Sequence, residues 1–413
     1  MLADGEAGEL VAAALRDLRA DPGEVRGAIG RLDSAGLRRY GVDACHLNLL
    51  SLLGATRAVD EVARTAEECA RTRLWRGWHF YASETAGARE PRPVLAGWDA
   101  DLIHRARARG RGVLVCGFHF GSYRFIPTDL ARLGFPVTFA VDTRTYENDS
   151  WGGGPPPGAG LELARIDDPA GLVTLLRAVR RGGVAYLNVD GNRGWGTGTA
   201  EPSHCTVAFL GLRLRVMTGA ARIAAANGAT LLPVAAAPDG ADPGRVVCGE
   251  PISPPAPGAD TAEFTARAMQ TLYDFFAEHV AATPAEWQDL RFLHRWRVPE
   301  APAAPTEYAA RDRLAAGAAF CLDGSRCVRV DGGDGAVWMD VRTMVTLRPP
   351  AWATDLFHAL AAPGGVDSRW LGARYPDAER HGAATDLLST LRSRGAVVEL
   401  AEFQERQRRL KEQ

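Results

Sequence analysis

One histidine, His119, stands where a strand is expected to run into a helix. The residues before it, Val113 to Cys116, form a short apolar, β-branched run that is typical of a strand buried on both faces. Glycines flank the histidine, and the periodic segment from Tyr123 to Leu133 predicts a helix. A strand that feeds a helix through a glycine turn places the turn at the carboxyl edge of a parallel sheet, where α/β proteins bind ligands. A neutral imidazole there can accept a proton near pH 7, which suits a general base acting on a hydroxyl or an amine.

Composition indicates a globular protein with a sizeable core. The chain has 413 residues, of which 46% are hydrophobic and 24% charged, enough for two or three domains. Its formal net charge of -2 gives no global electrostatic case for binding nucleic acid. No stretch reaches the ~18 apolar residues needed to span a bilayer. We therefore expect a cytoplasmic protein with no transmembrane segment, and peripheral contact with a membrane stays open.

The cysteines do not have the spacing of a metal site. All seven are scattered along the chain without a CxxC pair, which favours reduced thiols. The turn Asp190–Arg193 is not a calcium loop, because the next ligand positions are glycine, tryptophan and glycine. We predict no metal site.

Strand–helix alternation from residue 112 onward predicts a mixed, largely parallel sheet flanked by helices. Residues 71–81, RTRLWRGWHFY, are either a core-facing helix with outward-reaching arginines or the wall of a substrate groove. The glycine- and proline-rich stretch 151–158 is a loop, either a lid or a surface excursion. The expected strands are 113–116, 136–141, 184–189, 230–235 and 245–248, and the expected helices are 123–133, 170–181, 218–227 and 264–282.

Four parts are expected along the chain. A helical N-terminal cap at 1–40 precedes the α/β domain at 41–298. A proline-rich linker at 299–306 leads to a small α+β, winged-helix-like C-terminal domain at 307–413, which ends in a charged helical tail. In the C-terminal domain we expect a β-hairpin around 331–335, followed by two helices and a terminal strand.

Three stretches, taken together, resemble the lysophospholipid acyltransferase superfamily in its lipid A lauroyl/myristoyl acyltransferase branch. GVLVCGFHFGSYRF at 112–125 resembles the first block, which usually reads G-V-hydrophobic-x-x-x-H-F-G-N-W-E. The strand Val184–Asp190 and FLGLRLRVMTGAARIAAANGATLLPV at 209–234 resemble the second block. PAEWQDLRFLHRWR at 284–297 resembles the closing segment. The resemblance covers roughly residues 40–298 and implies a glycerolipid acyltransferase-like fold.

The resemblance implies transfer of an acyl group to a hydroxyl or amine of a small-molecule acceptor. The donor would be a thioester on an acyl or peptidyl carrier protein or on coenzyme A, so that acyl-phosphopantetheine is a co-substrate and no cofactor is bound. A chain without the membrane anchor of the lipid A enzymes suits specialised metabolism better than a lipid A precursor. The alternative is a non-catalytic carrier- or peptide-binding protein built on a degenerate acyltransferase domain, and peripheral phospholipid acylation is a third reading. Residues 307–413 loosely resemble peptide-binding proteins of the pyrroloquinoline-quinone chaperone type, which implies recognition of a peptide or carrier.

Position 124 departs from the family's H-x4-D/E pair. In the family the histidine deprotonates the acceptor, while the carboxylate five positions on orients the ring and stabilises the imidazolium. Here that position is Arg124, whose guanidinium cannot accept the imidazole N–H and would depress the pKa of the histidine. Three explanations stay open: a carboxylate from elsewhere, first Asp190 and second Asp142; an unassisted His119 with Arg124 binding an anionic substrate; or a site that only binds.

Further residues are predicted to contact the substrate. Arg213 and Arg215 form either a cationic rim for a phosphopantetheine phosphate or carrier protein, or a solvated strand face. Ser122 is predicted to cap the following helix, whose N-terminus favours a thioester oxyanion. The predicted catalytic residues are His119, Asp190 and Arg124, and the predicted substrate-binding residues are Ser122, Tyr123, Arg213, Arg215, Thr218 and Gly219.

Overall fold

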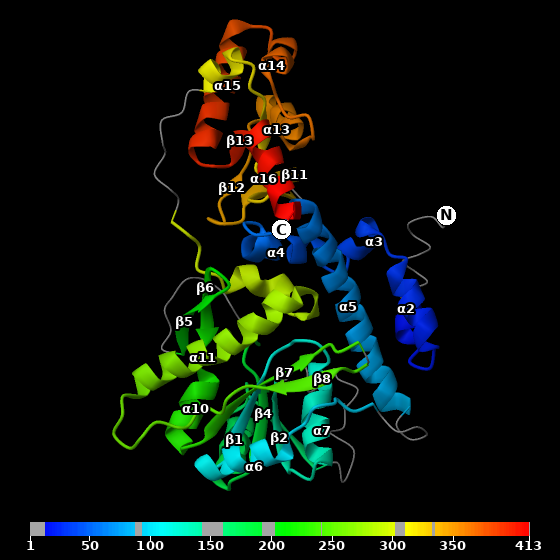
Figure 1. The fold of residues 1–413 in the computed structure, drawn as a ribbon, viewed down its shortest axis with the longest axis vertical. Helices are drawn as coiled ribbons and strands as arrows, with labels where there is room; N and C mark the ends of the chain where they lie inside the picture. The colour runs from blue at the N-terminus through cyan, green and yellow to red at the C-terminus, as the bar shows by residue number, and fades with distance from the viewer. Residues whose placement is uncertain are drawn as a thin grey trace. The chain divides into compact units, whose positions relative to one another are not determined.

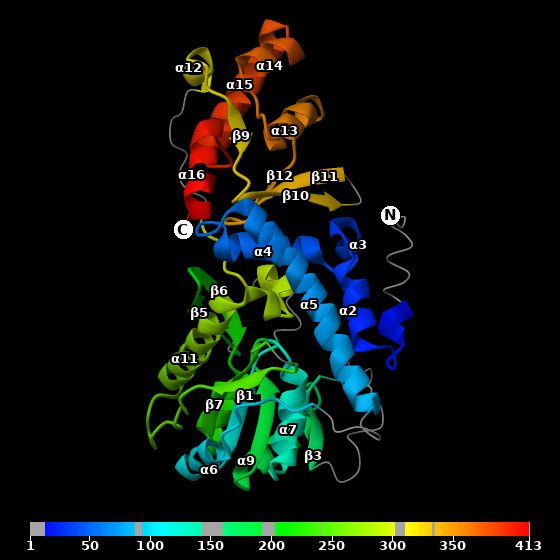
Figure 2. The same cartoon turned by 45° about the vertical axis from the view of Figure 1, so that its right-hand side comes forward.

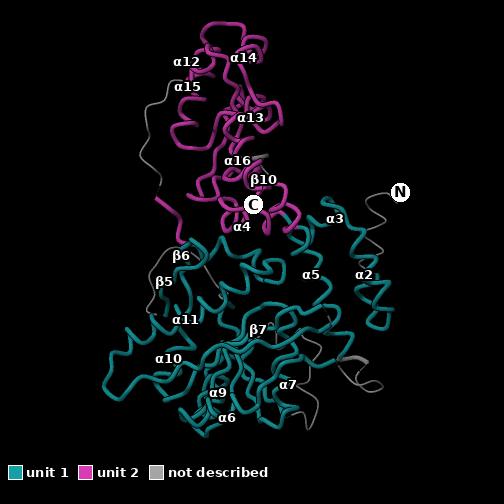
Figure 3. The backbone as a smooth tube through the Cα atoms, in the orientation of Figure 1, with its two compact units in different colours: residues 1–42, 67–297 teal, residues 43–66, 298–413 magenta. Residues whose placement is uncertain are grey.

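The computed structural model describes residues 13–86, 93–142, 160–191, 203–240, 242–301, 310–332 and 335–412. They form two compact units (Figure 3): residues 1–42 and 67–297 make unit 1, and residues 43–66 and 298–413 make unit 2. The segment 43–66, which was expected within 41–298, therefore lies in unit 2. The expected loop 151–158 and most of the expected linker 299–306 lie outside the described residues.

Unit 1 is built on a six-stranded sheet with the strand order β3-β2-β4-β1-β7-β8 (Figure 1). Neighbouring strands are parallel, except that β8 runs antiparallel to β7. A mixed α/β fold with a largely parallel sheet flanked by helices is thus confirmed. The strands are β1 (Val113–Gly117), β2 (Val137–Val141), β3 (Leu161–Arg165), β4 (Val184–Asn188), β7 (Thr230–Ala237) and β8 (Arg245–Cys248).

Helices cover both faces of this sheet (Figures 1 and 2). The chain leaves β1 for β2 in one direction and β4 for β7 in the other, and right-handed crossovers then place the connecting helices on opposite faces. One face carries α6 and α7, the other α9 and α10, and α11 packs against α10, β5 and β7. The helices of unit 1 are α2 (Pro22–Gly30), α3 (Ser34–Arg38), α5 from residue 67, α6 (Ala100–Arg109), α7 (Ile126–Arg132), α9 (Pro169–Arg180), α10 (Gly219–Asn227) and α11 (Thr261–Ala282), and its hairpin is β5 (His204–Phe209) with β6 (Leu212–Met217).

The central strand β1 is buried along its whole length, as its apolar run predicts. Val113 and Val115 belong to a core that includes Ile103 of α6 and Ile126 of α7. The burial of β1 on both faces makes its carboxyl end a rigid base for the loop that follows.

The segment 71–81 is a core-facing helix, as one of its two readings predicts. It belongs to α5 (Val59–Ala86), which buries Trp75 and Trp78 three positions apart. One of its arginines differs from that reading, because Arg76 is buried.

Two elements of unit 1 differ from the sequence-based expectation. Strand β3 was not predicted, since only Leu161 and Ala164 of its five residues are buried. The β5–β6 hairpin was also missed: Leu210 occupies a left-handed turn position (φ 47°) where the usual hairpin signal would be asparagine.

Unit 2 contains a three-stranded antiparallel sheet, β10-β11-β12, and a second antiparallel pair, β13-β9. The expected hairpin is confirmed as β10 with β11, and the exposed helix α16 is the charged tail. The core of unit 2 surrounds the fully buried Trp338, which packs on Phe357 with ring centroids 5.1 Å apart. The elements are α4 (Val42–Leu53), α12 (Ala310–Ala315), β9 (Phe320–Leu322), β10 (Cys327–Gly332), β11 (Gly335–Asp340), β12 (Thr346–Leu347), α13 (Thr354–Ala361), α14 (Ser368–Arg374), α15 (Ala378–Ser393), β13 (Val397–Glu399) and α16 (Leu400–Glu412).

Replacing Trp338 tests whether this core holds unit 2 together. We expect Trp338→Ala to lower the free energy of unfolding by about 3–5 kcal/mol, because the cavity it leaves is enclosed by packed side chains. Trp352, which is 38% exposed, is the matched control, and Trp352→Ala should cost much less. Urea unfolding followed by circular dichroism measures both, and equal losses in the two variants would contradict the assigned core.

Candidate active site

His119 lies in the loop after β1, between two aromatic anchors. Phe118 and Phe120 are fully buried and both pack on Phe276 of α11, the first stacked at 3.9 Å and the second edge-on at 5.8 Å. The main chain turns sharply here, since the Phe120 N–H donates to the Phe118 carbonyl at 2.7 Å. Phe118 and Phe120 hold the loop on α11, whereas the side chain of His119 is 16% exposed.

Asp190, from the loop after the neighbouring strand β4, is the main partner of His119. Its carboxylate is fully buried and accepts the His119 Nδ1 hydrogen bond at 2.8 Å. Both carboxylate oxygens lie 3.1 Å from the His119 backbone N–H, and the indole Nε1–H of Trp287 donates at 3.0 Å. A buried carboxylate is costly unless it is hydrogen-bonded, and these donors meet that requirement.

A second carboxylate faces the same imidazole nitrogen. Asp289 Oδ2 lies 3.3 Å from His119 Nδ1, and the Asp289 side chain is 19% exposed. Sequence reasoning assigned no site residue to the segment 284–297, so it missed both Asp289 and Trp287. The signal that could have found them was the resemblance of that segment, WQD included, to a family block.

The opposite nitrogen of the ring faces an oriented amide. Asn188 Nδ2 lies 3.4 Å from His119 Nε2, and the Tyr186 hydroxyl donates to Asn188 Oδ1 at 2.7 Å. In the neutral form of the ring, this arrangement assigns the proton to Nδ1 and leaves on Nε2 a lone pair that faces the Asn188 amide. Gly117 makes room for the Tyr186 hydroxyl, because a Cβ at position 117 would lie 2.3 Å from the hydroxyl oxygen.

The electrostatic balance around His119 favours its charged form. Burial lowers the pKa of the imidazole, and the nearby charge of Arg124 lowers it further. The negative charges of Asp289 and Asp190, with the hydrogen bond to Asp190, outweigh both and raise the pKa to about 9. The expected depression by Arg124 is therefore present, but the two carboxylates reverse the net effect.

Arg124 points into an aromatic cluster. It is half-buried, its Nη1 donates to the Tyr81 hydroxyl at 3.1 Å, and its guanidinium carbon lies 5.3 Å and 5.4 Å from the ring centroids of Tyr81 and Tyr123. Among the described residues the ion-pair partners of the imidazole are Asp190 and Asp289, and neither Arg124 nor Asp142 is one. The structure thus places the first of the two candidate carboxylates beside His119.

Of the predicted substrate-binding residues, Tyr123 alone contacts the imidazole, edge-on with centroids 4.8 Å apart. The prediction that Ser122 caps a helix is wrong: its side chain makes no capping bond, because the chain enters the 3-10 turn η1 (Tyr123–Phe125) before α7 begins.

The other four predicted residues lie on β6 and at the start of α10. Arg213 and Gly219 are exposed, the Arg215 backbone N–H donates to the Trp296 carbonyl at 2.7 Å, and Thr218 Oγ1 donates to the Ser203 carbonyl at 2.9 Å. The described contacts of the His119 ring include none of these four.

Comparisons with protein-family models and with curated protein sequences find no match to this chain. In the part of the chain that the structure describes, no three His, Cys, Asp or Glu side chains are grouped to hold a metal ion. The described helices also include none that is long and apolar enough to cross a bilayer.

The two carboxylates predict a specific titration of His119. We expect a pKa of about 9 for the native imidazole by NMR, and a lower pKa in Asp289→Asn, because one of the charges that stabilise the imidazolium is removed. The exposed Asp101 of α6 provides the control, and Asp101→Asn should leave the titration unchanged.

The same shift makes stability depend on pH. The raised pKa stabilises the fold fully below the unfolded value of about 6.5, and this contribution is lost as pH rises through about 9. A native pKa at or below 6.5, or one that Asp289→Asn does not move, would contradict the assigned electrostatics.

Proposed function

We propose that this protein is an acyltransferase, which moves an acyl group from a carrier-protein or coenzyme A thioester to a hydroxyl or amine. The observation that carries the proposal is the buried Asp190 carboxylate on His119 Nδ1, which orients the ring and leaves the Nε2 lone pair for a substrate proton. The ring sits at the carboxyl end of β1, and the chain leaves β1 and the adjacent β4 in opposite directions, where α/β sheets bind ligands.

The three sequence blocks that resemble the acyltransferase superfamily converge on this imidazole. His119 comes from the first block, Asp190 from the second, and Trp287 and Asp289 from the closing segment. These segments lie far apart in the chain, so their meeting at one side chain supports a common chemical purpose. The missing acid of the H-x4-D/E pair is then replaced by Asp190.

The proposed reaction needs one proton carrier. Nε2 of His119 takes the proton of the acceptor O–H or N–H, and the acceptor atom forms a bond to the thioester carbonyl carbon. The C–S bond then breaks, and the departing sulfur takes the proton from the imidazolium. The products are an ester or amide and a free thiol, and the negative charge of Asp190 stabilises the imidazolium between the two steps.

The raised pKa sets the pH at which this base works. With a pKa of about 9, only about 1% of the imidazole is neutral at pH 7 in the substrate-free protein. The rate should therefore rise about tenfold per pH unit and level off near pH 9. Asp289→Asn should move the rising limb to lower pH, which a kcat/KM profile measures.

Removing the imidazole tests the proposal directly. Acylated carrier proteins and acyl coenzyme A are incubated with the protein and candidate acceptors, and intact-mass analysis follows loss of the acyl group. We expect His119→Ala and Asp190→Asn to lower the rate by about 10²–10⁴-fold while the circular dichroism spectrum stays native. Full turnover in His119→Ala would overturn the proposal.

A histidine outside the site provides the control for this assay. His104 of α6 is exposed, and His104→Ala should retain the native rate. A stable complex of the native protein with an acylated carrier, without acyl loss, would instead favour the non-catalytic binding protein.

A further inference from the structure

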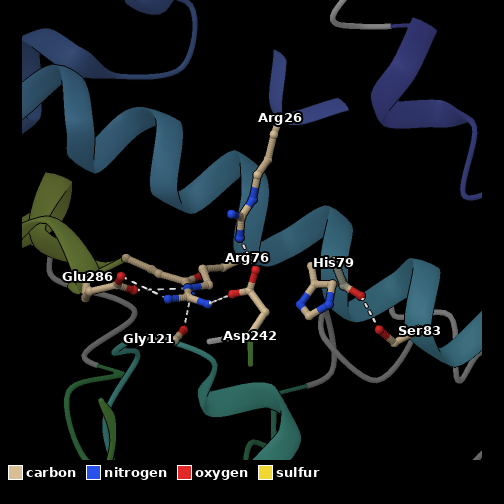
Figure 4. Close-up of polar contacts among 8 residues, drawn as sticks. Arg26, Arg76, His79, Ser83, Gly121, Asp242 and Glu286 are labelled. Carbon is tan, nitrogen blue, oxygen red and sulfur yellow. Dashed lines mark hydrogen bonds and ion pairs between the residues drawn. The ribbon is translucent and has the colours of Figure 1, made fainter. Parts of the chain in front are cut away.

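Arg76 of α5 is buried and pairs with Glu286 and Asp242 (Figure 4). Glu286 is in turn hydrogen-bonded to Gly121 in the loop that carries His119. The Arg76 side chain is 7% exposed, and its Nε and Nη2 donate to the two carboxylate oxygens of Glu286 at 3.1 Å and 3.0 Å. Its Nη1 donates to Asp242 at 2.6 Å, and Asp242 also pairs with Arg26. A two-point grip of this kind fixes the orientation of Glu286 as well as its distance.

The 3-10 turn η2 (Pro284–Glu286) ends at Glu286, and each residue from Glu286 to Gln288 is hydrogen-bonded to the His119 loop or to Asp190. The Glu286 carbonyl accepts the Gly121 N–H at 2.9 Å. The Gln288 N–H donates to the His119 carbonyl at 2.8 Å, and the Gln288 side chain donates to the Gly121 carbonyl at 2.7 Å. Trp287, between them, donates to Asp190. The segment 286–288 therefore holds both His119 and the carboxylate of Asp190 in place.

The loop has little freedom to adjust by itself. Gly121 has φ +56°, and a Cβ on it would lie 1.8 Å from the Ala236 carbonyl oxygen of β7. One side of the loop is thus pressed on the sheet, and its other side is held by 286–288. A shift of that segment has to appear as a shift of His119 or as lost hydrogen bonds.

Stability alone is a weak reason for the Arg76–Glu286 pair. Burying two charges costs several kcal/mol per ion, and apolar replacements of a whole buried pair are often neutral or stabilising. The pair does supply a fixed geometry next to the loop, which an apolar contact would not.

We propose that Arg76 is a positioning residue for His119 and Asp190, acting through Glu286 and the segment 286–288. The kinetic part of this inference rests on the acyl transfer proposed above, whereas its structural part does not. Both parts can be measured separately.

The test variant is Arg76→Met/Glu286→Gln, which removes both charges and leaves neither one of the pair buried alone. We expect hydrogen exchange at the Gly121 amide, read by NMR on 15N-glycine-labelled protein, to accelerate about tenfold or more as its bond to Glu286 loosens. The NMR titration of His119 should shift, and kcat should fall about 10²-fold with KM unchanged, as misplacement of a reacting group predicts.

A neighbouring pair on the same helix supplies the matched control. Arg71 pairs with Glu67 at 3.1 Å within α5, and Arg71 and Arg76 line one cavity of about 330 Å³. Arg71→Met/Glu67→Gln should leave Gly121 exchange, the His119 titration and kcat at native values. Because the cavity wall includes Arg76, guanidinium ion at low, non-denaturing concentration should restore Gly121 protection in Arg76→Ala.

The outcomes separate the two proposals. Native Gly121 exchange and a native His119 titration in the folded test variant would overturn the role of Arg76. Changes in both, in a protein that transfers no acyl group, would support the role of Arg76 and reject the acyltransferase. If the double variant does not fold, Arg76→Lys replaces it. A lysine ammonium cannot make the two-point contact with both carboxylate oxygens of Glu286, so Gly121 exchange should still accelerate. Unchanged exchange in Arg76→Lys would overturn the inference.

Discussion

The site depends on one fully buried carboxylate. Asp190 carries its charge out of water, and it is stabilised there only because a main-chain N–H, an imidazole and an indole all donate to it. These donors come from the loop after β1 and from the segment after α11, while Asp190 itself follows β4. A single acceptor thus joins three segments that are distant in sequence. Moving any one of them would leave a buried polar group unpaired, which is why the geometry around His119 is narrowly defined.

Orientation and basicity oppose each other at this imidazole. Carboxylates at Nδ1 align the ring, but each also stabilises the proton that a general base must be ready to take. Asp190 is buried and bonded on every side, whereas Asp289 is partly exposed and 3.3 Å away. Neutralising Asp289 would therefore lower the pKa of His119 while Asp190 still holds Nδ1.

The sheet and the position of His119 could be predicted from the sequence, because both follow from local patterns. A buried β-branched run, glycines and a helical period predict β1 and its loop, and similar runs predict β2, β4 and β7. Strand β3 and the β5–β6 hairpin were not predicted from the sequence. Only two residues of β3 are buried, and the β5–β6 turn has a leucine at positive φ. Asp190 could be predicted as a candidate from strand order in an α/β fold. Asp289 was missed because its contact with His119 arises only where the segment 284–297 packs on the loop after β1. Arg76 could not be predicted, because its partner Glu286 lies 210 residues later in the chain.

The carboxylate on His119 Nδ1 comes from Asp190, after the adjacent parallel strand β4, and not from position 124 in the turn that follows the histidine. Position 124 instead holds a cation, and the Arg124 guanidinium lies over the faces of Tyr81 and Tyr123. Its charge still lowers the pKa of His119, against the pull of the two carboxylates. An arginine at 124 therefore favours the neutral imidazole relative to an acid at the same position, and it partly offsets the two carboxylates that face the same ring.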